Sequence, residues 1–391
     1  MSIRPFSAIR QSAALLFAAG AGFSQTALAQ SSVTLYGAVD NALSYVSNQK
    51  GSSNLYMSQG NLNASKFGLL GSEDLGGRLK AIFRLESGFN SQTGAQSSAG
   101  YQFNRQAYVG MSSQSWGTLT AGRQYTPYFS YVGALGPTGV LTGATGAHPG
   151  DLDALDTTLR FNNSLTYTSP TFLGLQGGVQ YGLGGVAGHF AQGNTLSAGV
   201  RYDVGNVSVA AGYVHLNELT GSNAIGTVAD NSPVNAAYAS AQSNQIVGAA
   251  AQYHSGNWMV GVNYTNVLYR PGASSTFHDT AVFNTFGLIS TYQLTPAIAV
   301  AAGYSYTRAS RSNGITDSAS YNQFSMEQTY SFSKRTAIYF LEGYQRANGQ
   351  ILTANGGGIT SAVAVVGDSQ NGTPSSGPSQ FVGVVGLRHF F

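Results

Sequence analysis

The links between the repeating segments of this chain are alternately very short and long. Over 33–391, segments of roughly ten residues alternate apolar with polar positions, as strands with two unlike faces do. Links such as 113–115 and 255–256 are very short, whereas 126–158 and 217–244 are long and rich in Gly, Ser, Asn and Thr. A transmembrane β-barrel has this layout, with tight turns on one side of the membrane and long loops on the other. In a soluble β-sandwich, nothing requires all the short turns to lie on one side.

The pattern predicts an all-β, transmembrane antiparallel barrel of sixteen strands. The expected strands are 33–46, 62–71, 78–90, 101–112, 116–125, 159–168, 172–181, 196–203, 207–216, 245–254, 257–266, 283–293, 297–308, 321–332, 336–347 and 380–391. An even number of strands puts both termini of the chain on the short-turn side, which is the periplasm for a bacterial outer membrane. Eighteen strands stay open as an alternative, because the loop after Phe190 or the segment 348–379 has room for a hairpin.

The composition fits a barrel better than it fits helical membrane spans. The chain has no cysteine, 8% charged residues and a mean hydropathy of -0.04. No internal stretch approaches the ~18 consecutive apolar residues that a membrane-spanning helix requires. A barrel keeps such neutral hydropathy because only every second residue of a strand meets lipid.

The N-terminal segment has the pattern of a secretory signal. Arg4 and Arg10 form a positive n-region, a short apolar run follows, and small residues precede a cleavage site after Ala29. We therefore expect a signal peptide at 1–29 and a mature barrel at 30–391. The alternative is an anchor helix, for which the apolar run is too short.

The basic character of the chain comes mostly from this signal. Two of the 18 Lys and Arg residues lie in it, so 16 bases remain against 15 acids in the mature chain. A nearly neutral mature chain gives no electrostatic argument for binding nucleic acid. The sequence has no Cys-x-x-Cys or His-x-x-x-His spacing, no Gly-x-Ser-x-Gly elbow and no phosphate-binding loop with Lys. We expect no enzyme activity, no cofactor, no metal site and no nucleic-acid partner.

Several sequence blocks resemble the general porins of Gram-negative bacteria, especially their β-proteobacterial branch. The blocks are SVTLYG at 32–37, GSEDLG at 71–76, LESGF at 85–89, GRQY at 122–125, the segment 160–170, SKRT at 333–336 and GLRHFF at 386–391. They span the mature chain in the order that the family has.

This resemblance implies an outer-membrane barrel that assembles as a homotrimer and folds its third long loop into the lumen. It implies a water-filled channel for passive diffusion of ions and small hydrophilic solutes. The expected partners are those solutes and ions, outer-membrane lipid and lipopolysaccharide, and the barrel-assembly machinery during biogenesis. Phe391 resembles the terminal aromatic of the assembly signal, and the alternative is a strand that simply ends in an aromatic residue.

The third long link and the polar strand faces supply the residues expected at the pore constriction. The acids expected on the link 126–158 are Asp151, Asp153 and Asp156. The bases expected opposite, each on the polar parity of its strand, are Lys66, Arg84, Arg105 and Arg160. The resemblance carries this basic cluster most directly onto Lys66, Arg105 and Arg160, with Lys66 standing where an arginine is expected. Alternatives for the acids are a solvated loop tip, helix caps or a calcium site, although the spacing lacks the EF-hand pattern.

Opposed acids and bases across a narrow aqueous gap create a transverse field. That field orients dipolar solutes and separates the paths of cations and anions. Because several wall bases face few loop acids, we expect weak anion preference. Alternatives to a general diffusion porin are a porin selective for an anion or a sugar, and a plugged barrel that acts in adhesion through its outer loops.

Arg123 differs from these bases because it shares parity with Leu119 and Ala121 and so points out of the barrel. An arginine facing lipid costs roughly 2–4 kcal/mol at the membrane midplane. We interpret Arg123 as a trimer-contact residue, with snorkelling to the headgroups as the alternative. Aromatic residues such as Tyr101 and Tyr125 form no regular ladder and are interpreted as girdle or packing residues.

Overall fold

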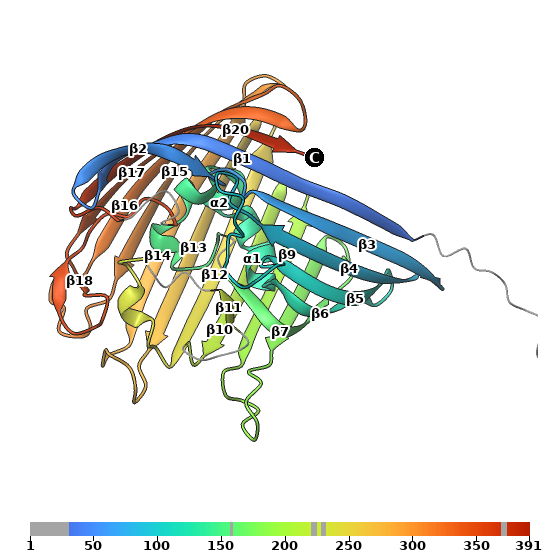
Figure 1. The fold of residues 1–391 in the computed structure, drawn as a ribbon, viewed down its shortest axis with the longest axis horizontal. Coiled ribbons are helices and arrows are strands. Elements are labelled where there is room, and N and C mark those ends of the chain that lie inside the picture. Colours follow the sequence, from blue (N-terminus) through green and yellow to red (C-terminus); the bar gives the residue numbers. More distant parts are fainter. Residues whose placement is uncertain (1–30, 157–158, 220–224, 228–231, 369–373) are drawn as a thin grey trace, which may run out of the picture.

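The computed structural model describes residues 31–156, 159–219, 225–227, 232–368 and 374–391. The expected signal peptide at 1–29 lies outside these residues. Within them, sixteen long strands form one closed antiparallel barrel, which confirms the predicted fold class and strand number (Figure 1).

The first strand closes the barrel by pairing with the last strand. β1 (Ser32–Gln49) pairs along one edge with β20 (Ser379–Phe390) and along the other with β3 (Lys66–Gly76). The remaining wall strands follow in chain order and are β4 (Leu79–Gly88), β5 (Gln106–Ser113), β6 (Gly117–Tyr125), β7 (Arg160–Thr168), β8 (Leu175–Gly182), β9 (Thr195–Val204), β10 (Val207–Asn217), β12 (Ser243–Ser255), β13 (Trp258–Arg270), β14 (Ala281–Gln293), β15 (Ile298–Ala309), β16 (Ser320–Ser331) and β17 (Thr336–Asn348).

Four short strands among the described residues are not part of this sixteen-strand wall. β2 (Ser52–Gln59) pairs with the part of β1 beyond its contact with β3, and β11 (Ile225–Thr227) pairs with the start of β7. β18 (Gln350–Leu352) and β19 (Ile359–Ser361) form a separate two-stranded sheet. The segment 348–379 therefore does contain a hairpin, but this hairpin adds no strand to the wall.

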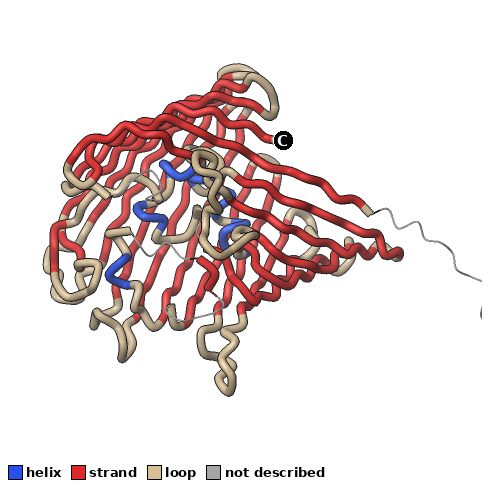
Figure 2. Tube along the Cα trace, in the orientation of Figure 1, coloured by secondary structure: helices blue, strands red, loops and turns tan. Residues whose placement is uncertain are grey.

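The links between wall strands alternate in length as the sequence predicts. Residues 256–257 join β12 to β13, whereas residues 126–159 join β6 to β7. Gly256 has a φ of 56°, a left-handed conformation that glycine adopts without strain and that tight hairpin turns require. Figure 2 shows loops at both ends of the strands, with those at one end much longer.

The third long link, 126–159, holds most of the helical residues (Figure 2). Its helices are α1 (Pro127–Tyr131), η1 (Gly133–Leu135), α2 (Pro137–Val140), η2 (Gly143–Gly146) and η3 (Pro149–Asp151); η4 (Ala236–Tyr238) lies in the link between β10 and β12. α1 begins at Pro127 because Thr126 Oγ1 accepts the N–H of Phe129 at 3.1 Å and proline suits the first helical position. No helix among the described residues is long and apolar enough to cross a membrane.

Most wall strands expose large apolar side chains on one face and bury polar side chains, or side chains covered by a link, on the other. In β6, Leu119 is 46% exposed and its neighbour Thr120 only 7%. In β20, Leu387 is exposed whereas Val384 is buried. Large apolar residues exposed in alternation around a closed barrel form the lipid-facing band of a membrane protein.

The C-terminal residue is part of the β1–β20 seam. The N–H of Phe391 donates to the carbonyl of Gly37 at 3.1 Å, and the N–H of Gly37 donates to the carbonyl of Phe391 at 3.2 Å. A Cβ atom on Gly37 would lie 2.3 Å from the Phe391 ring, so only glycine permits this close approach.

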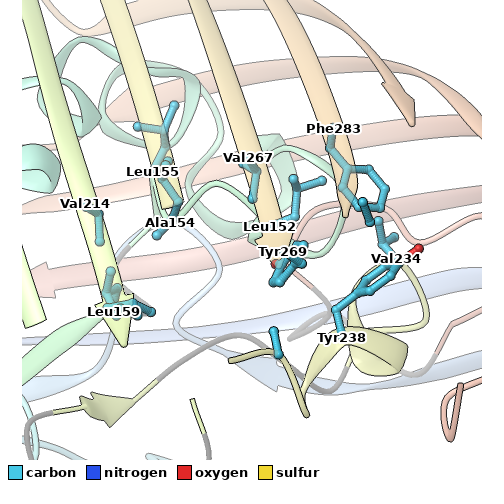
Figure 3. Close-up of a cluster of buried hydrophobic side chains, with 14 of the residues drawn as sticks. Leu152, Ala154, Leu155, Leu159, Val214, Val234, Tyr238, Val267, Tyr269 and Phe283 are labelled. Atoms are coloured by element: carbon cyan, nitrogen blue, oxygen red, sulfur yellow. The ribbon is translucent and has the colours of Figure 1, made fainter. Parts of the chain in front are cut away.

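The largest cluster of buried apolar side chains lies where long links meet the wall (Figure 3). Leu155 of the third link belongs to this cluster together with Val214 of β10 and Val267 of β13. Tyr238 of η4 also belongs to it and stacks on Tyr269 with ring centroids 5.1 Å apart. Hydrophobic contact therefore holds the third link and the β10–β12 link against the same part of the wall.

Candidate pore lining

The polar faces of β1 and β3–β8 border two cavities. The first, of about 720 Å³, is lined by strand residues such as Thr120, Thr166 and Gln176. The second, of about 710 Å³, is lined mainly by residues of the long links. Lys66 and Ser130 line both cavities, so the two spaces are neighbours at these residues of β3 and the third link.

A row of glycines lets α1 lie directly on the wall. The register partners in this row are Gly178 on β8, Gly199 on β9, Gly212 on β10 and Gly248 on β12. A Cβ atom on Gly199 would lie only 2.8 Å from the carbonyl oxygen of Pro127 and 2.8 Å from the Tyr131 ring. The bare backbone of the row therefore forms the seat of the helix, because any side chain there would displace it.

Neutral wall side chains hold the backbone of the third link. The bonds run from Tyr128 N–H to Ser197 Oγ (3.2 Å), from Gln252 Nε2 to the Leu135 carbonyl (3.1 Å) and from Gln323 Nε2 to the Ala147 carbonyl (2.7 Å). These contacts reach from β9 to β16, so the link is fixed along its length. They also satisfy buried backbone groups that have no partner in a regular helix or strand.

Arg105 is buried and paired at the opposite wall. Its Nε lies 3.0 Å from Glu86 Oε1, and the Tyr36 hydroxyl donates to the other oxygen of the same carboxylate at 2.7 Å. Arg84 lies beside this pair, with its guanidinium 5.5 Å from the centroid of the Tyr36 ring. Arg84 lines the first cavity and Arg105 the second.

The Tyr125 ring brings two of the expected bases together. The guanidinium carbons of Arg160 and Arg105 lie 4.9 and 5.8 Å from its centroid, within the range of cation–π attraction. Arg160 Nη2 also donates to the Tyr125 hydroxyl at 3.2 Å, and the Phe129 ring of α1 lies 5.1 Å away. Tyr125 is thus a packing residue, and it packs on the bases that line the cavities.

Asp156 faces the basic cluster. It lines the second cavity together with Lys66, Arg105 and Arg160, and its charge acts on the Arg105 guanidinium. Asp151 is buried and its Oδ1 accepts the N–H of Asp156 at 2.9 Å, which orients the turn that carries Asp156.

Asp153 is fully buried between the third link and the wall. Its Oδ2 lies 2.5 Å from His148 Nδ1 and accepts the hydroxyl of Thr265 on β13 at 2.7 Å. Burial alone would raise the pKa of Asp153, but the His148 ring and these hydrogen bonds outweigh burial and hold the pKa below its ordinary value. Asp153 lines neither cavity and anchors the link to β13.

Comparison with known proteins identifies the family. The model of a family described as Gram-negative porin matches residues 12–350. The chain belongs to the Gram-negative porin family.

Curated porins and solved barrels agree with this assignment. An outer membrane porin protein of Bordetella pertussis is 36% identical over 222 residues, which cover 50% of this chain and 57% of that protein. Outer membrane porin protein 32 of Delftia acidovorans is 33% identical over 224 residues, which cover 53% of this chain and 59% of that protein. The chain thus matches a little over half the length of these curated relatives.

The solved structures show the same fold over nearly the whole chain. An anion-selective porin from Comamonas acidovorans has a TM-score of 0.70 at 22% identity, covering 93% of this chain and 100% of that one. A loop L8 deletion mutant of OmpT, an outer membrane protein of Vibrio cholerae, has a TM-score of 0.65 at 16% identity, covering 92% and 99%. Family membership and the closed barrel place this porin in the outer membrane of a Gram-negative bacterium.

Arg123 of this porin is enclosed within its own chain. Its Nε donates to the carbonyl of Asn104 at 2.7 Å, its Nη1 donates to Asn162, and its guanidinium lies 5.1 Å from the centroid of the Tyr101 ring. The side chain is buried even in a single chain. Contacts within the chain therefore compensate the buried charge of Arg123. The sequence alone did not reveal these contacts.

Sequence reasoning missed the porin residues that join links to wall. Parity identifies Gln252 and Gln323 as inward-facing, but it does not show that their amides bond the third link. Alternation along its strand puts Glu86 on the same face as Arg84, whereas its pairing with Arg105 depends on register across β4 and β5. Among the described residues, no group of three or more His, Asp or Glu side chains is arranged to hold a metal ion.

Proposed function

We propose that this porin forms a water-filled channel for passive diffusion of ions and small hydrophilic solutes across the outer membrane. The observation that carries the proposal is that two neighbouring cavities inside the barrel share the lining residues Lys66 and Ser130. The third link, seated on the inner side of β8–β12, narrows the passage at this point from one side. The basic wall of β3–β7 borders it on the other.

The charges at this junction favour anions weakly. Lys66, Arg105 and Arg160 line the second cavity, with Asp156 as the acid of the third link that lines it too. Asp151 and Asp153 line neither cavity, so their carboxylates act on permeating ions less than that of Asp156. Fixed charges of one sign lining an aqueous gap raise the local concentration of the opposite ion. The Comamonas protein of the same fold is described as anion-selective, which agrees with this inference.

The proposed working form is a homotrimer in lipid and lipopolysaccharide, inserted by the barrel-assembly machinery. Arg123 is our candidate for a subunit contact. Alternation along β6 puts it on the outward face, and a neighbouring subunit there would stabilise its buried charge better than lipid would. Phe391 is our candidate for the assembly signal, because this aromatic residue directly follows β20 and its backbone bonds to Gly37 at the seam.

Conductance of the purified trimer in planar bilayers tests the channel. We expect a large ohmic conductance and a reversal potential that indicates weak anion preference. A clear cation preference would contradict the charge argument. Block by micromolar concentrations of one solute would support a substrate-selective channel instead. Silence from correctly inserted trimers would refute the channel and favour an adhesion or structural barrel.

A further inference from the structure

The last long link, between β17 and β20, lies against the same inner wall as the third link. Val366 belongs to a buried cluster with Leu341 of β17 and Val384 of β20. A Cβ atom on Gly343 would lie 2.6 Å from Val366 Cγ1 and 2.9 Å from Thr145 Cγ2. Both links therefore rest on the inner face of β17, and glycine at 343 leaves the space for them.

Three glutamines fix the backbone of this last link. The bonds run from Val365 N–H to Gln345 Oε1 (2.7 Å), from Gln345 Nε2 to the Val365 carbonyl (2.5 Å), from Val366 N–H to Gln380 Oε1 (2.9 Å) and from Gly367 N–H to Gln323 Oε1 (3.1 Å). These side chains come from the adjacent strands β16, β17 and β20. They hold the link to the wall much as a neighbouring strand would.

The last link also bonds directly to the third link. The N–H of Gly150 donates to the carbonyl of Gly367 at 2.8 Å, and the N–H of Asp368 donates to the carbonyl of Ala144 at 3.1 Å. Gly367 has a φ of 69°, and a Cβ atom there would lie 2.1 Å from the carbonyl oxygen of Ala144. These contacts fix the backbone of Asp368 beside η2.

Asp368 lines the second cavity together with Asp156 and the basic residues Lys66, Arg105 and Arg160. We propose that Asp368 is a second acid of the constriction and helps to set ion selectivity, an inference that rests on the proposed channel function. The constriction then takes its acids from two links, because Asp156 comes from the third and Asp368 from the last. Selectivity reflects the balance between both carboxylates and the basic wall.

The charge of Asp368 opposes the preference that the wall bases create. Asp368 is 5% exposed, so replacing its carboxylate by an amide of the same shape removes one negative charge from the border of the aqueous gap. We expect Asp368→Asn to raise the anion-to-cation permeability ratio about two- to fivefold, the effect of one unit charge close to the ion path in a partly screened gap. Asp368→Glu keeps the charge, so we expect it to keep the permeability ratio of the unchanged protein.

Reversal potentials of trimers in planar bilayers under a salt gradient measure this ratio. The matched control is Asp317→Asn, because Asp317 is an exposed acid in the link between β15 and β16 and lines neither cavity. Gel mobility before and after heating reports whether each variant forms a folded barrel.

The outcomes separate this inference from the channel proposal. A non-conducting unchanged protein refutes the channel. A conducting protein in which Asp156→Asn shifts the reversal potential and Asp368→Asn does not refutes the role of Asp368 alone. An equal shift in Asp368→Glu and Asp368→Asn also refutes it, because a lost contact rather than a lost charge would then explain both.

Discussion

The cavity-lining face of β3–β7 and the link-contacting face of β9–β17 have different surroundings, and their side chains differ accordingly. The first borders open cavities and carries charged residues, among them Lys66 and Arg84. The second is covered by links and meets their backbone with neutral side chains, which are Ser197, Gln252, Gln323 and Gln345. Water or a partner can compensate a charge beside a cavity, whereas a covered position is satisfied most cheaply by a hydroxyl or an amide.

In the proposed channel, the wall that borders the cavities faces the passage and the covered wall supports the links. Among the residues that the structure describes, the covered region does contain a contact between an acid and an imidazole, that of Asp153 with His148. It obeys the same rule because the two groups are buried as a pair, and Thr265 donates a further hydrogen bond to the carboxylate. Removing one member of such a pair is the most damaging change that the comparison predicts.

Asp153→Ala should therefore have the largest effect on stability. It leaves His148 buried without its partner and frees the third link from β13, at a cost of about 3–5 kcal/mol. We expect a lower unfolding temperature, measured by loss of the compact gel form on heating, and noisy or enlarged single-channel currents. Asp317→Ala, at an exposed acid, should change neither. An unaltered unfolding temperature in Asp153→Ala would contradict the anchor.

Gly199→Val should have the next largest effect, because it places a side chain under α1. The two contacts of 2.8 Å that a Cβ would make with Pro127 and Tyr131 force the helix away from the wall. Overpacking of this kind costs about 1–3 kcal/mol. We expect reduced single-channel conductance, since the displaced helix enters the passage.

The matched control for this change is Gly177→Val. Gly177 lies one residue from the glycine row on the opposite strand face, and a Cβ there would meet only the Gly199 carbonyl, at 3.7 Å. We expect its conductance to equal that of the unchanged protein. Equal conductance in both variants would show that the glycine row does not position α1.

The barrel itself could be predicted from sequence because its physical signal is repeated many times. Alternation with period two and alternating link lengths recur in every hairpin, so errors at single strand ends do not change the conclusion. The strand face that carries Lys66, Arg84 and Arg160 could also be predicted, because the orientation of one strand residue fixes that of its neighbours. Strand ends were less certain, and β5 begins at Gln106 where the sequence predicted 101.

The arrangement of the links could not be predicted in the same way. Asp151, Asp153 and Asp156 look equivalent in sequence and all three are largely buried, yet only Asp156 lines a cavity. The packing of the segment 362–368 on the wall depends on glutamines far away in the chain. Such contacts have no periodic signature, because each joins one loop backbone to one wall side chain.

Arg160→Ala tests the wall that borders the cavities. We expect it to change stability little and to change ion selectivity measurably. Removing this base should shift the permeability ratio toward cations about two- to fivefold, because the second cavity loses one positive charge. Arg201→Ala is the control, since Arg201 pairs with Asp203 at 2.9 Å and lines neither cavity. Arg105→Ala is less informative because it also leaves buried Glu86 without its partner. Identical reversal potentials in Arg160→Ala and the unchanged protein would show that Arg160 does not reach the ion path.

The smallest expected effect is that of pH on the Asp153 anchor. Because the pKa of Asp153 lies below its ordinary value of 3.8, the anchor's contribution is fully present above that value and is lost only as pH falls through the lower pKa of the folded protein. The unfolding temperature should then show no contribution from Asp153 in the neutral range and a decline in strong acid. Other carboxylates also titrate there, so the measurement is a comparison with Asp153→Asn, which has no proton to gain at this position. The acid decline should be smaller in Asp153→Asn, and parallel curves for the two proteins would show that the buried carboxylate is not what holds the link to β13.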